Sequence, residues 1–180
     1  MKESLLFPPS WHPSQPYLSL PCLTAFLDQA GITNNTQRDL NIELLDTILT
    51  RTYGLDVYER LVDKLKELEQ SREGEFGPGS DEHYGRVVES LDRFPHLIDA
   101  IEPAKASLRC EEFYDIDRYR ESLFLIDRWL EVVSSIYFPT RLTVVDNQLS
   151  YSIYSSRDIL KAVKDEQQNP YIELYRQYFL

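Results

Sequence analysis

Apolar residues along this chain recur mainly at three- and four-residue steps, the spacing that places side chains on one face of an α-helix. The clearest run ends before Pro139, and its apolar positions are Ile116, Tyr119, Leu123, Ile126, Leu130, Val133 and Tyr137. Two more runs with this spacing cover residues 40–68 and 87–101. The pattern therefore predicts a chain built mainly of helices.

Glycine and proline divide these helical runs. Gly54 interrupts the first run, and segment 74–79 holds three of the six glycines and predicts a loop. Pro95 lies inside the second run, where we expect a kink or a break, and Pro103 predicts a second break. Ser80 or Asp81 would cap the helix that follows the loop.

The first forty residues predict a strand, a helix and a second strand. Residues 4–7 are apolar and stop at two prolines, which is typical of a buried strand. A helix follows over 17–30, with Ser19 as the expected N-cap and Gly31 as the C-terminal stop. Its apolar face consists of Leu20, Leu23, Phe26, Leu27 and Ala30. The polar stretch 32–38 predicts a short second strand.

The last forty residues return to β-like patterning before two final helices. Residues 142–153 alternate between apolar and polar positions around Asp146-Asn147, which predicts a β-hairpin. Helices are expected over 157–166 and 171–180.

Composition restricts the function classes. The 180 residues include 30 acidic and 19 basic side chains, which gives a net charge of -11. This balance argues against a nucleic-acid ligand and against an anionic membrane surface, because both require clustered Lys and Arg. Only Cys22 and Cys110 are present, far apart, which favours a reducing cytoplasm over a disulfide framework. We therefore expect a cytoplasmic protein with no transmembrane helix.

Most candidate chemical groups have a simpler structural interpretation. Asp115 and Asp117 could indicate a metal site, but they stand at the start of the strongest helix, where the helix dipole favours negative charge. His83 and His96 are too far apart to share a helical face as ligands, so structural roles are expected for both. No spacing of Ser, His, Asp or Cys indicates a nucleophile.

The segment that follows the first strand is the best candidate for a binding site. Ligands of open α/β sheets bind at the carboxyl ends of strands, which is where this loop would lie. Its aromatic rings offer flat apolar surface for a large planar ligand, and its histidine offers a donor or a metal ligand. The alternative is a proline-rich loop whose aromatic residues pack on the core. The candidate cofactor-binding residues are Pro8, Pro9, Trp11, His12, Pro16 and Tyr17.

A family resemblance arises from these residues and those after them. The sequence Leu5-Leu6-Phe7-Pro8-Pro9-x-Trp11 is followed by Pro16-Tyr17-Leu18-Ser19-Leu20-Pro21-x-Leu23-x-Ala25-x-Leu27, then Gly31 and Asp39-Leu40-Asn41. This opening resembles the N-terminus of cobalamin-binding radical S-adenosylmethionine proteins. Asn169-Pro170-Tyr171 also resembles a tripeptide that precedes their third strand. The resemblance is specific over 5–45 and loose beyond.

The resemblance implies a mainly α fold with a small β component (α+β): a partial doubly wound α/β start (β-α-β) followed by a helical insertion. Residues 1–45 would form the first half of a cobalamin-binding-type domain, 46–141 the insertion, and 142–180 a hairpin and helices leading to further strands. The chain has no C-x-x-x-C-x-x-C triplet. A 4Fe-4S cluster and S-adenosylmethionine are therefore expected only in a downstream domain, and this N-terminal fragment alone is expected to be inactive.

A second hypothesis is a non-catalytic, acidic, helical protein-interaction module. The net charge, the long amphipathic helix and the aromatic tail at 171–180 favour it. Under either hypothesis the first strand needs a covered edge. We expect helices, the 142–153 hairpin or a second copy of the chain to supply that cover, and we expect a tendency to form homodimers.

Overall fold

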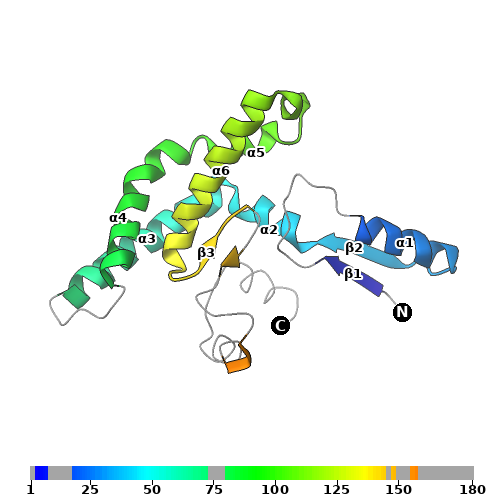
Figure 1. Cartoon of the computed structure of the whole chain (residues 1–180), viewed down its shortest axis with the longest axis horizontal. Helices are drawn as coiled ribbons and strands as arrows, with labels where there is room; N and C mark the ends of the chain where they lie inside the picture. Colours follow the sequence, from blue (N-terminus) through cyan, green and yellow to red (C-terminus); the bar gives the residue numbers. More distant parts are fainter. Residues whose placement is uncertain (1–2, 8–17, 73–79, 145–146, 149–154, 158–180) are drawn as a thin grey trace.

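The computed structural model describes residues 3–7, 18–72, 80–144, 147–148 and 155–157. Helices dominate these residues and strands are short (Figure 1), which confirms the predicted mainly α fold with a small β component. The elements, in chain order, are β1 (Glu3–Phe7), α1 (Ser19–Gln29), β2 (Asn35–Asp39), α2 (Leu40–Ile48), α3 (Arg51–Arg72), α4 (Ser80–Leu97), α5 (Ile101–Ser107), the 3-10 helix η1 (Glu111–Tyr114), α6 (Ile116–Ile136), β3 (Arg141–Leu142) and β4 (Asn147–Gln148).

The N-terminal elements form a β-α-β unit. Strands β1 and β2 pair in parallel, with Glu3 opposite Asn35 and Phe7 opposite Asp39. The polar residues of β2 thus form a strand by pairing with an apolar neighbour. Gly31, at φ 78°, ends the connecting helix in the left-handed conformation that glycine tolerates best. Ser19 was expected as the N-cap but is the first residue of α1; the cap position is Leu18, which makes no side-chain cap bond.

The helices from α2 onward share one apolar core around Trp129. Its side chain is fully buried, and its indole Nε1 donates to the carbonyl oxygen of Ile48 at 2.7 Å. The predicted interruption at Gly54 is wrong, because Gly54 lies inside α3. The break comes instead at Leu49 and Thr50, where the Thr50 hydroxyl accepts a hydrogen bond from the Tyr53 N–H at 3.2 Å and so caps α3.

Gly54 has a packing role. A Cβ added there would come within 2.5 Å of Trp129 Cη2 and would also meet Ile98 Cδ1. The missing side chain therefore allows α3 to approach α6 closely.

The two prolines of the next helices lie near helix ends, where proline costs little helix stability. Pro95 lies in the last turn of α4, and the chain leaves the helix only after Leu97. Pro103 lies in the first turn of α5, where a backbone N–H would have no partner within the helix. The break expected at Pro95 lies instead at residues 98–100, between α4 and α5. The break expected at Pro103 is this same interruption, which comes before the proline.

The described residues contain part of the predicted hairpin, although Asn147, expected in its turn, belongs to strand β4. Strands β3 and β4 pair antiparallel, with Leu142 opposite Asn147. Among the described strands this pair is separate from β1 and β2, so the hairpin does not cover the edge of β1 as one expectation proposed. Residues 149–154, and the helices predicted beyond residue 157, lie outside the described residues.

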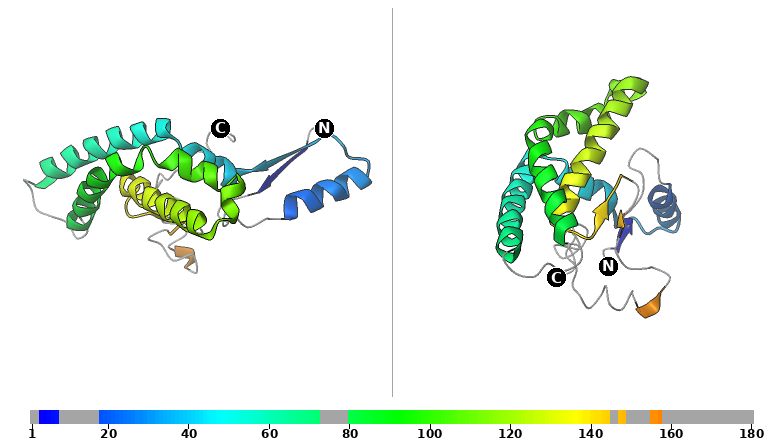
Figure 2. Two further views of the ribbon diagram at one scale, coloured as in Figure 1. Left: turned by 90° about the horizontal axis from the view of Figure 1, so that it is seen from above. Right: turned by 60° about the vertical axis from the view of Figure 1, so that its left-hand side comes forward.

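The β-α-β unit and the helices occupy different parts of the molecule. In Figures 1 and 2, α1, β1 and β2 extend to one side of α3–α6, and α2 connects the two regions. Among the described helices, none combines the length and apolar character that crossing a membrane requires.

Candidate functional site

The carboxyl ends of β1 and β2 lie at the same edge because the strands are parallel. Phe7 is opposite Asp39, so β1 ends beside the start of α2. The six predicted cofactor-binding residues, Pro8, Pro9, Trp11, His12, Pro16 and Tyr17, lie outside the described residues. The structure therefore describes the edge at which β1 ends, and the binding role of the six residues stays a prediction.

The Asp39-Leu40-Asn41 triplet turns the chain from strand to helix at this edge. One Asp39 carboxylate oxygen accepts hydrogen bonds from the backbone N–H groups of Asn41 and Ile42, both at 3.0 Å. Asp39 is thus the N-cap of α2. Leu40 and Asn41 are both buried, with exposed fractions of 1% and 4%. The triplet that carries the family resemblance has a clear structural role.

A bidentate ion pair stabilises the same turn. Arg38, in β2, donates to both carboxylate oxygens of Glu43 through Nε at 2.9 Å and Nη2 at 2.5 Å. Both side chains are about one third exposed. Glu43 also lies in the first turn of α2, where the helix dipole favours a negative charge. The pair links the end of β2 to the first turn of α2.

Helix α1 leaves most of its predicted apolar face uncovered. Leu20 is its one buried residue. Phe26 is 68% exposed, Leu23 is 49% exposed, and Leu18, just before the helix, is 65% exposed. An exposed apolar surface of this kind is typical of a contact site for another surface.

The other candidate groups from the sequence have structural roles. Asp115 caps α6, since its carboxylate accepts from the backbone N–H groups of Asp117 at 3.0 Å and Arg118 at 3.2 Å. Across the described ranges, no three His, Cys, Asp or Glu side chains are grouped so that they could hold a metal ion.

His83 is held between α4 and the end of α6. Its Nε2 lies 2.9 Å from the carbonyl oxygen of Ser135, and its ring stacks on Phe138 with centroids 4.6 Å apart. Burial lowers the pKa of His83 below its usual 6.5, and the hydrogen bond to Ser135 opposes this shift. His96, near the end of the same helix, is exposed.

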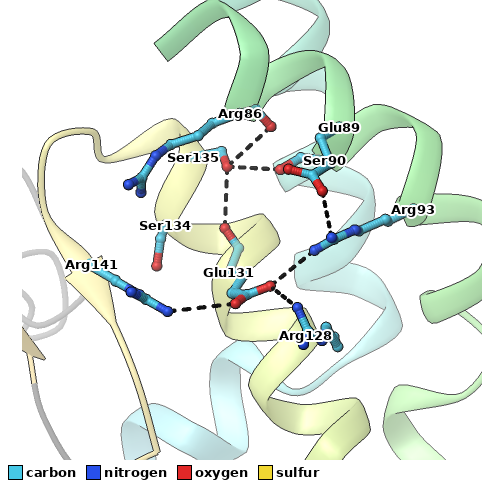
Figure 3. A pocket seen from close by; sticks show the side chains of 9 residues that line it. All are labelled: Arg86, Glu89, Ser90, Arg93, Arg128, Glu131, Ser134, Ser135 and Arg141. Carbon is cyan, nitrogen blue, oxygen red and sulfur yellow. Dashed lines mark hydrogen bonds and ion pairs between the residues drawn. The ribbon is translucent and has the colours of Figure 1, made fainter. Parts of the chain in front are cut away.

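One group of residues was missed by the sequence reasoning. A hollow of about 260 Å³ lies between α4, α6 and β3 (Figure 3). Its lining consists of Arg86, Glu89, Ser90, Arg93, Arg128, Glu131, Ser134, Ser135 and Arg141. The nearest signal in the sequence was the i, i+3 or i, i+4 spacing of Glu and Arg along α4 and α6, which is ordinarily a surface ion-pair pattern.

Comparison with protein-family models, with curated proteins and with solved structures found no match for this chain.

Proposed function

We propose that this chain supplies the first β-α-β unit of the cobalamin-binding domain of a radical S-adenosylmethionine protein. The observation that carries the proposal is the parallel β1–β2 pair, joined by α1, with Phe7 and the Asp39-Leu40-Asn41 turn at one edge. Ligands of open α/β sheets bind in the crevice outside the carboxyl ends of the strands.

The described side chains at this edge are better suited to supporting the cofactor site than to contacting the cofactor. The Asp39 carboxylate is used in capping α2, and Arg38 is paired with Glu43. Contact with the corrin ring would therefore fall to segment 8–17, where Pro8, Pro9, Trp11, Pro16 and Tyr17 would line one side. His12 would act as a donor or a cobalt ligand.

Within this proposal the reaction belongs to a larger assembly. Cobalamin would carry a methyl group or tune a radical step. The reductive cleavage of S-adenosylmethionine needs an iron–sulfur cluster, and two cysteines cannot provide its three thiolate ligands. The cluster and further strands would come from downstream domains, and this chain would orient the cofactor.

The test is cobalamin retention by the natural polypeptide that carries this chain, with any coding sequence that follows Leu180. Hydroxocobalamin is added, free cofactor is removed by gel filtration, and the bound fraction is measured by absorbance. We expect about one cobalamin per chain, and at least a tenfold loss of affinity for a Trp11→Ala, Tyr17→Ala double variant.

Phe124→Ala is the matched control, because Phe124 is 58% exposed on α6, away from the β1–β2 edge. Its cobalamin affinity should equal that of the wild type. A stop codon directly after Leu180, with no adjacent frame encoding strands and a cysteine triplet, would contradict the proposal. So would the absence of binding by the longer polypeptide.

The second candidate is an acidic protein-interaction module without chemistry, and the exposed apolar face of α1 favours it. The same face would support a homodimer. Light scattering separates the outcomes: a monomer at all concentrations would count against the dimer, while a longer polypeptide that binds no cobalamin would favour the interaction module.

A further inference from the structure

The hollow between α4, α6 and β3 is lined mainly by charged side chains from three separate elements. Arg86 and Arg93 come from α4, Arg128 from α6, and Arg141 from β3 (Figure 3). Its volume is about 260 Å³. This is close to the lower end of the range for small-molecule sites, about 300 Å³.

The floor of the hollow is held rigidly. The hydroxyl groups of Ser90 and Ser135 share a hydrogen bond of 2.7 Å, and both residues are buried. Ser134 donates to the Leu130 carbonyl oxygen at 2.6 Å and accepts from the Leu142 N–H at 2.8 Å, which fixes β3 to α6. These hydrogen bonds therefore hold the elements that carry the arginines in fixed positions.

Glu131 is the centre of the charged network. One of its carboxylate oxygens is 2.9 Å from Arg93 and 2.8 Å from Arg128, and the other is 3.6 Å from Arg141. Three guanidinium groups thus share one carboxylate. The contact to Arg141 is longer than a hydrogen bond, so this guanidinium, about half exposed, has donors available for another acceptor.

The lining carries more positive than negative charge. Four arginines face two lining carboxylates, those of Glu89 and Glu131, and a third, Glu82, pairs with Arg86 from outside the hollow. Positive charge therefore remains in excess, although the chain as a whole carries -11. An ion-pair network that served only to join helices would need no excess of positive charge. Repulsion among the arginines makes such an excess unfavourable.

Guanidinium groups favour one kind of ligand. Each presents planar N–H donors that match the oxygens of a phosphate or carboxylate, and several together stabilise a doubly charged anion. Phosphate monoesters carry about -1.5 to -2 at neutral pH, opposite in sign to the excess charge of the lining.

We propose that this hollow is a binding site for the phosphate group of a small phosphorylated molecule. Arg141 would close one side of the site, and the phosphate would compete with Glu131 for Arg93 and Arg128. The site is independent of the β1–β2 edge and of any role in cobalamin binding.

The test uses the whole chain and inorganic phosphate at about pH 8, where the dianion predominates. Thermal unfolding is followed with increasing phosphate, against sodium chloride at equal ionic strength. At about 100 times Kd, we expect phosphate to raise Tm by about 5–10 °C more than chloride. The absence of any rise beyond that with chloride would overturn the proposal.

Two arginine variants make the test specific. Arg141→Gln removes only the long contact to Glu131 and should weaken phosphate binding at least tenfold. Arg118→Gln makes the same change of charge near the start of α6, outside the hollow, and its Kd should stay within about twofold of the wild type. Equal weakening in both variants would indicate nonspecific screening and would contradict the site.

A third variant separates ligand binding from a purely structural network. Glu131→Gln removes the internal carboxylate that competes for three arginines. The proposal predicts a Kd for phosphate several-fold lower than that of the wild type, even if the starting Tm falls. An unchanged or higher Kd would contradict it.

Discussion

The helical region and the β-α-β unit differ in how much of their apolar surface is buried. In the helices, Val57, Leu61, Val87 and Trp129 are completely buried. In the β-α-β unit, α1 buries only Leu20. Two parallel strands and one helix enclose little apolar surface, and parallel sheets are normally covered on both faces. We therefore expect the helices to be the more stable region and the β-α-β unit to open more readily.

The largest test of this comparison is the loss of Trp129. The indole fills the helical core, with its ring centroid 6.0 Å from that of Phe94, and donates to Ile48 at 2.7 Å. Trp129→Ala should lower the free energy of unfolding by about 3–5 kcal/mol. Urea denaturation followed by circular dichroism measures the loss. A loss below about 1 kcal/mol would show that the core is not organised around Trp129.

Gly54 tests how tightly the helices pack. An Ala there would gain about 0.5–1 kcal/mol of helix preference, but its Cβ would clash with Trp129 and Ile98, so we expect a net loss of about 1–3 kcal/mol.

Gly85→Ala is the matched control, since Gly85 lies inside α4 and nothing stands within 4 Å of an added Cβ. It should stabilise the protein by about 0.5–1 kcal/mol. The two variants should therefore move the urea midpoint in opposite directions. A shift in the same direction would contradict close packing at Gly54.

His83 gives a smaller, pH-dependent effect. Burial lowers its pKa in the folded state below the 6.5 of the unfolded chain, so below pH 6.5 the unfolded state takes up the proton more readily. The contribution of neutral His83 is fully present above pH 6.5 and is lost as the pH falls through the folded pKa. His83→Gln should therefore show a weaker loss of stability on acidification than the wild type.

The exposed His96→Gln provides the comparison on the same helix. The free energy of unfolding of both variants and of the wild type is measured at about pH 7.5 and pH 5. If both variants follow the wild-type pH dependence, the proton uptake does not come from His83.

The smallest effect on stability is expected at Phe26. Its side chain is 68% exposed, so Phe26→Ala should change the unfolding free energy by less than about 0.5 kcal/mol. The same change at Phe94, 5% exposed, should cost about 3 kcal/mol or more. The proposed homodimer, measured by sedimentation, should instead weaken in Phe26→Ala. A large loss of stability at Phe26 would mean that α1 is covered within the chain.

Sequence patterns predicted the elements whose signals are local. Helix α6 follows from its apolar spacing, and Gly31 ends α1 where expected because a left-handed residue is a strong local signal. Strand β2 was predicted although its residues are polar, and they form a strand by pairing with β1. Gly54 was misinterpreted because its packing against Trp129 depends on residues 75 positions away.

The arginine-lined hollow could not be predicted for a related reason. Its residues lie on three elements between positions 86 and 141, and each element alone shows an ordinary pattern of exposed charges. The helix packing brings them together. The spacing of apolar residues predicted an apolar face on α1, but such a pattern does not show whether that face is buried, and only Leu20 is.

Hydrogen exchange of the whole chain, followed residue by residue, tests the contrast most directly. Backbone amides exchange at a rate set by the free energy of the local opening reaction. We predict that amides of α6 around Trp129 exchange only through global unfolding, while those of β2 and α1 exchange at least a hundredfold faster, a difference of about 2.8 kcal/mol. Equal protection of the two regions would contradict the account, because the β-α-β unit would then be as stable as the helices without a further surface.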